Sequence, residues 1–163
     1  MTAVGSILFV RRSIFIKAAP VRVWREFESH ECMARWWGVM RDPPEIGEPN
    51  GMELVTYEPR VWAMLEMRIK NADGQWRFGG RITVFDPPRE LTFENDWIEP
   101  NEGWLLPTFI TLRLTPALDG TVVELFHHGF ERTGTDAGDT HAGYESGWGM
   151  LQLETLRALV EGA

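Results

Sequence analysis

Gly80-Arg-Ile-Thr-Val-Phe-Asp-Pro-Pro-Arg-Glu-Leu-Thr-Phe93 lies near the middle of the chain and decides its fold. Apolar and polar residues alternate before the two prolines and again after them, which is typical of strands with one buried face. Because proline cannot donate a hydrogen bond to a sheet ladder, residues 86–89 must form the turn between two antiparallel strands. The stretch therefore predicts one hairpin of a sheet whose inner face is apolar.

Similar alternation predicts strands in other parts of the chain. Within 75–85, the apolar Trp76 and Phe78 share one face, whereas Arg77 and Arg81 share the other. One apolar and one charged face is typical of an antiparallel sheet that is covered on one side only. The predicted strands are 8–18, 52–58, 61–70, 75–85, 90–97, 108–115 and 121–129.

Helices are predicted before and after these strands. Two short helices are expected over 20–28 and 30–38, followed by an irregular loop over 41–51. A long helix is expected from residue 139 or 140 to about residue 161. Its apolar face would carry Tyr144, Trp148, Leu151, Thr155, Leu156 and Leu159. This order of elements predicts an α+β fold, in which a curved antiparallel sheet wraps around a long C-terminal helix, with two short helices after the first strand.

Composition limits the classes of function. With 163 residues, 44% of them hydrophobic, the chain fits one globular domain with a core. The formal net charge of −8 disfavours binding to a nucleic-acid backbone. No run approaches the ~20 apolar residues of a membrane span, and no signal-peptide pattern opens the sequence. The single cysteine, Cys32, cannot form an intrachain disulfide. We therefore expect a cytoplasmic protein.

Three segments resemble a known superfamily. They are Ile16–Gly38, Gly80–Phe93 and Gly120–Phe130, the last followed by Gly147-Trp148 and the leucines of the final helix. In this order they are similar to the START-like, or SRPBCC, helix-grip superfamily typified by the birch-pollen allergen. Within it they are most similar to homologues of the activator of the heat-shock-protein-90 ATPase. The resemblance implies one helix-grip domain over residues 10–163, preceded by an N-terminal extension, 1–9.

The resemblance also implies an interior pocket, because proteins of this superfamily commonly hold hydrophobic or amphipathic ligands between sheet and helix. Largely apolar walls with a few polar groups are typical of such pockets. Gly80, which has no side chain on the inner face, favours a cavity, although the same aromatic rings could instead fill the space. The predicted ligand-binding residues are Leu65, Met67, Trp76, Phe78, Phe93, His127, Tyr144, Trp148 and Gln152.

His127 is the one weak candidate for a catalytic residue. It shares parity with the apolar residues of its strand, so it should face the helix, where an imidazole could act as a general base. The alternative is a buried histidine that is hydrogen-bonded within the protein, and His128 should face solvent. No metal site is predicted, because His30, Glu31 and Cys32 diverge around a helix and no paired ligands accompany them.

Three functions therefore stay open. The first is a small-molecule binding protein that uses no cofactor and performs no catalysis. The second is an enzyme of the polyketide cyclase/dehydrase or hydrolase type that uses His127. The third is a chaperone-associated interaction module, which requires an exposed apolar patch, and outward charges such as Arg113 and Glu124 argue against one on the sheet. The oligomeric state also stays open, with a homodimer as one alternative.

Overall fold

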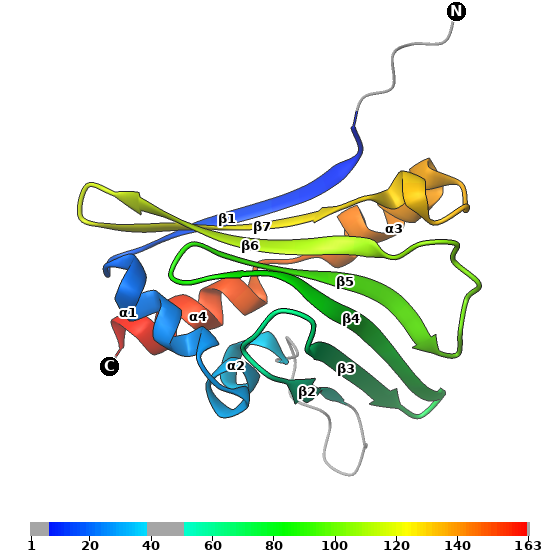
Figure 1. Ribbon diagram of the computed structural model, residues 1–163, viewed down its shortest axis with the longest axis horizontal. Coiled ribbons are helices and arrows are strands. Elements are labelled where there is room, and N and C mark those ends of the chain that lie inside the picture. Colours follow the sequence, from blue (N-terminus) through cyan, green and yellow to red (C-terminus); the bar gives the residue numbers. More distant parts are fainter. Residues whose placement is uncertain (1–6, 39–50, 163) are drawn as a thin grey trace, which may run out of the picture.

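The computed structural model describes residues 7–38 and 51–162, which form a curved antiparallel sheet around a C-terminal helix (Figure 1). The predicted α+β helix-grip architecture is confirmed. The strands pair in the order β1-β7-β6-β5-β4-β3-β2. They are β1 (Phe9–Ile16), β2 (Gly51–Tyr57), β3 (Met64–Asn71), β4 (Gly74–Asp86), β5 (Glu90–Glu99), β6 (Thr108–Ala117) and β7 (Gly120–His128). The helices are α1 (Pro20–Trp24), η1 (Arg25–Phe27), α2 (His30–Trp37), η2 (Phe130–Arg132), α3 (Ala137–Gly147) and α4 (Leu151–Glu161).

Two expectations fall partly outside this description. Residues 1–6 of the expected N-terminal extension and residues 41–50 of the expected loop lie outside the described residues. Phe9, the last residue of that extension, is the first residue of β1. None of the described helices has the length and apolar character needed to cross a membrane.

The Pro-Pro turn joins β4 to β5 as predicted. Asp86 pairs with Glu90 at the end of the ladder, and the Arg89 amide donates to the Asp86 carbonyl at 2.7 Å. The Arg89 guanidinium also bonds the Asp86 carboxylate, with Nε 3.0 Å from Oδ2, and this contact holds the pKa of Asp86 below its usual range. These contacts begin a register that leaves Phe93 and Asn95 buried on the inner face of β5.

Two consecutive glycines let the strands on both sides of β4 approach closely. The β4–β5 pairing is irregular on either side of Gly79 and Gly80, and such bulges bend a strand. Gly79 has a φ of 138°, which favours glycine. A Cβ at Gly80 would lie 2.5 Å from the Glu94 carbonyl oxygen of β5. The absence of a side chain at Gly80 thus permits strand contact, and the prediction that it leaves room for a cavity is wrong.

Replacing Gly79 by alanine is expected to lower the free energy of unfolding by about 3 kcal/mol or more. The new methyl group would collide with the Leu65 carbonyl oxygen of β3, and alanine would keep an unfavourable positive φ. Urea denaturation measures the change. Gly143→Ala is the control, because a Cβ at Gly143 meets open space in α3 and alanine favours helix. A Gly79→Ala protein as stable as the wild type would contradict this account of β4.

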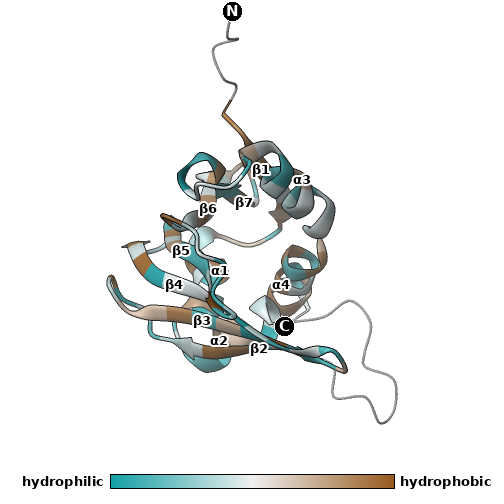
Figure 2. Cartoon of the chain, turned by 90° about the vertical axis from the view of Figure 1, so that its right-hand side faces the viewer, coloured by the Kyte–Doolittle hydropathy of each residue, from teal (hydrophilic) through white to brown (hydrophobic). Residues whose placement is uncertain are grey.

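The C-terminal helical segment is divided in two, which corrects the predicted continuous helix. Trp148 lies between α3 and α4 with extended dihedral angles, φ −75° and ψ 113°. Glycine disfavours helix, and α3 contains three glycines, at 138, 143 and 147, while Gly149 follows the break. Figure 2 shows α4 on the concave side of the sheet. Its buried residues are Leu153, Leu156 and Val160, so the predicted apolar face was right only in part.

Aromatic side chains both fill the core and line a space beside it. Trp24 stacks on Phe27 with ring centroids 4.6 Å apart, and Phe27 contacts Trp36 at 5.0 Å. All three side chains are buried. Trp37 continues this row, and its ring centroid lies 5.9 Å from that of Trp148. The row of aromatic rings therefore extends from the short helices to the break between α3 and α4, where it borders a cavity.

Candidate functional site

A cavity of about 240 Å³ lies between the sheet and the C-terminal helices. Strands β2 to β6, the end of α2, the end of α3 and the start of α4 all contribute to its wall. Among the described residues, none that lines it is charged. The lining residues are Trp37, Met52, Met67, Ile69, Phe78, Phe93, Asn95, Trp97, Ile110, Tyr144, Gly147, Trp148 and Gln152.

Six of the nine predicted ligand-binding residues lie on this wall. They are Met67, Phe78, Phe93, Tyr144, Trp148 and Gln152. The other three lie elsewhere: Leu65 is completely buried in the core, and Trp76 is half-buried opposite Ile69 near the end of the β3–β4 hairpin. His127 is completely buried and contacts Trp148 from behind the wall.

Seven lining residues are not among the nine that the sequence predicted to bind a ligand. They are Trp37, Met52, Ile69, Asn95, Trp97, Ile110 and Gly147. Strand parity could have found several of them, because Asn95 and Trp97 alternate with Phe93 along β5. Asn95 was overlooked because a polar side chain is not expected on an apolar face. Trp37 and Gly147 stand at helix ends, whose position relative to the sheet only the tertiary structure defines.

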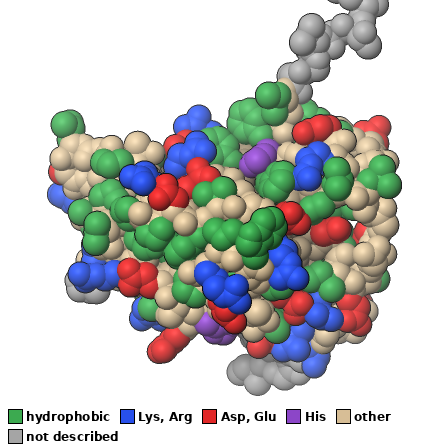
Figure 3. Space-filling view, in the orientation of Figure 1, with side chains coloured by type: hydrophobic (Ala, Val, Ile, Leu, Met, Phe, Trp, Pro, Cys, Tyr) green, Lys and Arg blue, Asp and Glu red, His purple; other side chains and the backbone are tan. Residues whose placement is uncertain are grey.

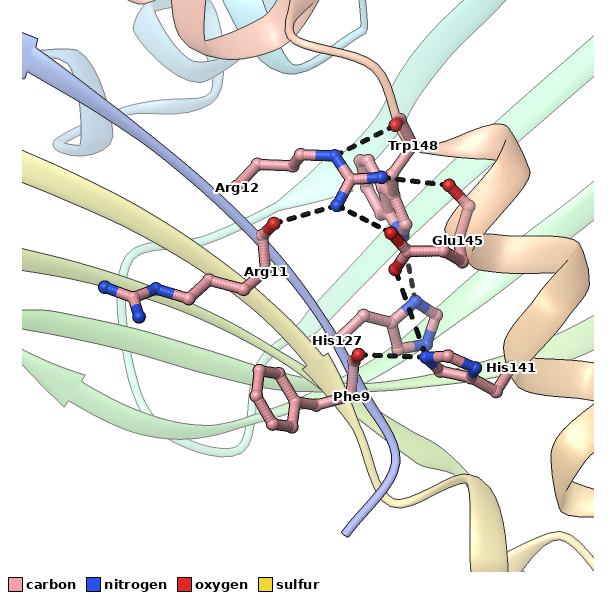
Figure 4. Close-up of polar contacts among 7 residues, drawn as sticks. All are labelled: Phe9, Arg11, Arg12, His127, His141, Glu145 and Trp148. Carbon is pink, nitrogen blue, oxygen red and sulfur yellow. Dashed lines mark hydrogen bonds and ion pairs between the residues drawn. The ribbon is translucent and has the colours of Figure 1, made fainter. Parts of the chain in front are cut away.

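His127 is hydrogen-bonded through both ring nitrogens behind the cavity wall, and Figure 4 shows its bond to Trp148. Trp148 Nε1 donates to His127 Nδ1 at 3.0 Å, and because an indole nitrogen can only donate, Nδ1 must be unprotonated. His127 Nε2 therefore carries the proton and donates to Thr108 Oγ1 at 2.8 Å. The Thr108 hydroxyl in turn donates to the Asn95 carbonyl at 3.0 Å. The network defines one tautomer and occupies both ring nitrogens.

Burial keeps His127 neutral. Burial, and to a smaller degree the neighbouring His128, lowers the pKa of His127 to about 3. Protonation would also place a second N–H against the indole N–H of Trp148. The neutral imidazole can thus hold the Trp148 ring at the wall. His128, which was expected in solvent, is half-buried and stacks on Phe109 with centroids 5.5 Å apart.

Arg12 of β1 holds the end of α3, as Figure 4 shows. Its Nε donates to the Trp148 carbonyl at 3.1 Å, and its Nη2 donates to the Glu145 carbonyl at 2.9 Å. Carbonyl groups at the end of a helix lack partners within the helix, so the guanidinium caps α3 where the chain turns. His141 adds a second contact, with Nε2 2.9 Å from the Phe9 carbonyl oxygen. Two side chains therefore connect α3 to the first strand.

Replacing Arg12 by glutamine is expected to loosen α3 while the sheet stays folded. The loss of two charge-assisted hydrogen bonds costs about 1–3 kcal/mol, so the amides of α3 should exchange with solvent about tenfold faster or more. Hydrogen exchange followed by mass spectrometry measures this. Arg11→Gln is the matched control, because Arg11 pairs with Glu124 on the outer sheet face, 2.8 Å away. Unchanged exchange in the Arg12 variant would contradict the capping role.

The outer face of the sheet carries aromatic side chains between its charges. The guanidinium carbons of Arg11 and Arg113 each lie 5.6 Å from the centre of the Phe126 ring. The Phe9 ring lies 6.2 Å from the same ring. Figure 3 shows this face, on which hydrophobic side chains alternate with charged ones. The expectation of outward charges was right, but it overlooked the aromatic residues among them.

Potential metal ligands do not gather within the described residues. No three histidine, cysteine, aspartate or glutamate side chains come together there. His30 instead connects α2 to β2, with Nε2 2.8 Å from the Leu54 carbonyl oxygen. The Cys32 amide donates to the Ser29 hydroxyl at 3.1 Å, which caps α2.

A curved sheet that wraps around a C-terminal helix, with an apolar cavity between them, defines a member of the START-like, or SRPBCC, superfamily. Residues 17–161 match the model of the family described as activator of Hsp90 ATPase homolog 1-like protein. The chain belongs to this family. The resemblance found in the sequence is therefore confirmed.

Solved structures share this fold at low sequence identity. A protein from Chromobacterium violaceum is 22% identical, with 94% of this chain and 97% of that chain covered and a TM-score of 0.65. The Aha1 dimer from Colwellia psychrerythraea is 19% identical, with coverages of 95% and 97% and a TM-score of 0.57. A protein of the dynemicin biosynthetic locus is 17% identical, with coverages of 96% and 48% and a TM-score of 0.61. The comparison with curated proteins found no relative.

Proposed function

We propose that this protein binds a small, largely apolar molecule in its interior cavity and does not convert it. The cavity itself, about 240 Å³ in volume and lined by aromatic and aliphatic side chains, carries the proposal. Protein interiors are close-packed, and atoms around an empty space lose contacts, so an unfilled cavity costs stability. A bound apolar molecule would restore those contacts. Membership of a superfamily in which such ligands are common supports the same conclusion.

Two measurements on the purified protein test this proposal. Native mass spectrometry, followed by extraction under denaturing conditions, should reveal a small molecule that co-purifies. The uncharged dye N-phenyl-1-naphthylamine should bind one site per chain with a dissociation constant of about 10 µM or lower, and its fluorescence should rise on binding. A protein that carries no small molecule and also fails to bind the dye would contradict the proposal.

Catalysis by His127 is the weaker alternative. A general base needs a ring nitrogen within reach of the substrate, and both nitrogens of His127 are bonded to Trp148 and Thr108. His127 also lies behind the cavity wall rather than on it. The similarity to a protein of the dynemicin biosynthetic locus extends only to the fold. The geometry therefore favours a structural role for His127.

Self-association is a second proposal, which one observation favours. The outer sheet face presents Phe9, which is 46% exposed and lies beside the Phe126 ring, and Phe15, which is 42% exposed and pairs with Val122 further along β1. A relative from Colwellia psychrerythraea is described as a dimer. Sedimentation velocity at increasing protein concentration would reveal a homodimer, and Phe126→Glu should then shift it to monomer. A wild-type protein that stays monomeric up to about 100 µM would contradict self-association.

A further inference from the structure

We propose that the ligand carries an uncharged hydrogen-bonding group, a carbonyl or a hydroxyl, and that the Asn95 side chain binds it. This inference rests on the proposed binding function. Asn95 lines the cavity, and only 3% of its surface is exposed. Its backbone carbonyl accepts a hydrogen bond from Thr108. Its side-chain amide lies close enough to the Tyr144 hydroxyl to oppose part of the rise in the pKa of that group, so two polar groups meet at the cavity.

A buried amide is an unusual feature of an otherwise apolar wall. Burying an amide costs free energy unless its donors and its acceptor all find partners. Asn95 stands between Phe93 and Trp97 on the inner face of β5, where leucine would fit the same space without this penalty. An asparagine side chain has two N–H donors and one oxygen acceptor, so the Tyr144 hydroxyl can meet only part of this capacity. A ligand group that bonds the remainder explains why the chain tolerates the amide.

Other polar groups on the wall are also uncharged. Tyr144, Trp97 and Gln152, whose side chains carry a hydroxyl, an indole nitrogen and an amide, line the same cavity as Asn95. Burial raises the pKa of Tyr144 to about 12, although the Asn95 side chain lies near enough to oppose part of this rise. Tyr144 is therefore a neutral phenol at physiological pH. Together these groups can donate to or accept from a neutral ligand group.

The wall disfavours a charged ligand. No lysine, arginine, aspartate or glutamate lines the cavity among the described residues, so an ion would lose its hydration without gaining a counter-charge. The carboxylate of Asp96 helps to raise the pKa of Tyr144, which shows that its negative charge acts on this part of the cavity. An anionic ligand would meet that same charge.

Aromatic pairs on the wall favour a flat ligand. Trp37 and Trp148 have ring centroids 5.9 Å apart, and Phe78 and Trp97 have centroids 5.4 Å apart. Both pairs border the cavity. Stacked or tilted contacts between rings add to the gain from burying apolar area. A flat ring system with one neutral polar group therefore fits the wall best.

A matched set of naphthalene derivatives tests this inference. The probes are naphthalene, 2-naphthol, 2-acetylnaphthalene and 2-naphthoate, which share one ring system and differ in the polar group. Isothermal titration calorimetry at about pH 7.5 should show that 2-naphthol and 2-acetylnaphthalene bind about tenfold more tightly than naphthalene. The anion 2-naphthoate should bind at least about tenfold more weakly than 2-acetylnaphthalene.

Asn95→Leu should remove the preference for the polar probes. Naphthalene should bind this variant within about twofold of the wild type, whereas 2-naphthol and 2-acetylnaphthalene should fall to the affinity of naphthalene. Asn101→Leu is the control, because it makes the same change at an exposed position that does not line the cavity. It should keep the tenfold preference. Wild-type protein offers a second readout, since the Asn95 side-chain amide signals in an NMR spectrum should shift with 2-acetylnaphthalene much more than with naphthalene.

The outcomes separate this inference from the proposed function. If none of the four probes binds and N-phenyl-1-naphthylamine also fails to bind, the binding function is wrong, and the role of Asn95 fails with it. If the probes bind with equal affinity, or if 2-naphthoate binds best, the cavity binds ligands but the inference about Asn95 is overturned. A polar preference that survives in Asn95→Leu, or unmoved Asn95 amide signals, would overturn it as well.

Discussion

Replacing Ile69 by tryptophan should weaken the binding of N-phenyl-1-naphthylamine by about 100-fold. Ile69 is half-buried on β3, and its side chain lies on the cavity wall. An indole in this position would occupy space that the dye needs, and excluding one aromatic ring from a buried site forfeits about 2–3 kcal/mol. That loss corresponds to about two orders of magnitude in the dissociation constant. Because Ile69 is only half-buried, the larger ring has room to shift toward solvent, so the fold should persist.

A second tryptophan variant provides the control for this experiment. Val55 lies on the neighbouring strand β2, is 37% exposed and does not line the cavity. Val55→Trp adds the same indole to the protein and should leave dye binding within about twofold of the wild type. Thermal unfolding of both variants shows whether the fold is kept. Full affinity in a folded Ile69→Trp protein would mean that the dye binds outside the cavity.

Acidification should destabilise the protein through His127. The pKa of His127 is about 3 in the folded protein, whereas an exposed histidine has a pKa of about 6.5. Between these values the unfolded chain binds a proton that the folded protein does not, so stability falls as the pH falls below about 6.5. Each pH unit is worth about 1.4 kcal/mol, and His127 alone should therefore contribute a loss of about 3 kcal/mol by pH 4.5.

Urea denaturation of His127→Gln isolates this contribution. The variant should be less stable than the wild type near neutral pH by about 2–4 kcal/mol, because Trp148 or Thr108 loses its buried partner. Its loss of stability between about pH 7 and pH 4.5 should be smaller by about 3 kcal/mol, since the titrating group is gone. His141→Gln is the control, because it removes an imidazole that bonds the backbone of β1 outside this network. The same pH dependence in wild type and His127→Gln would contradict the buried neutral histidine.

Strand parity predicted much of the cavity wall. The placement of Met67, Phe78 and Phe93 follows from the alternation of side chains along β3, β4 and β5. Parity was less useful where a strand bends, because the bulges around Gly79 change which side chains face inward. It also gave no reason to choose a polar residue, and Asn95 was therefore missed.

Helix periodicity was a weaker guide than strand parity. It placed Tyr144 and Trp148 toward the sheet, and both line the cavity. It could not place the break at Trp148, where Arg12 reaches the end of α3 from the far end of the chain and bonds the Glu145 and Trp148 carbonyls. Because α4 is a separate helix, the positions that face the sheet no longer follow the spacing counted from α3. Leu153 and Val160 are therefore buried in α4, together with the predicted Leu156.

The sequence by itself determined the order of strands and helices, the Pro-Pro hairpin and the family. Each of these depends on local periods and turn residues that neighbouring positions define. Only the tertiary structure decided that His127 lies behind the wall and that Asn95 lies on it near Tyr144. Both side chains belong to the inward-facing positions of their strands. They differ in their access to the cavity because of the position of Trp148 between the two helices. Contacts between residues far apart in the chain establish that position, and no local pattern contains them.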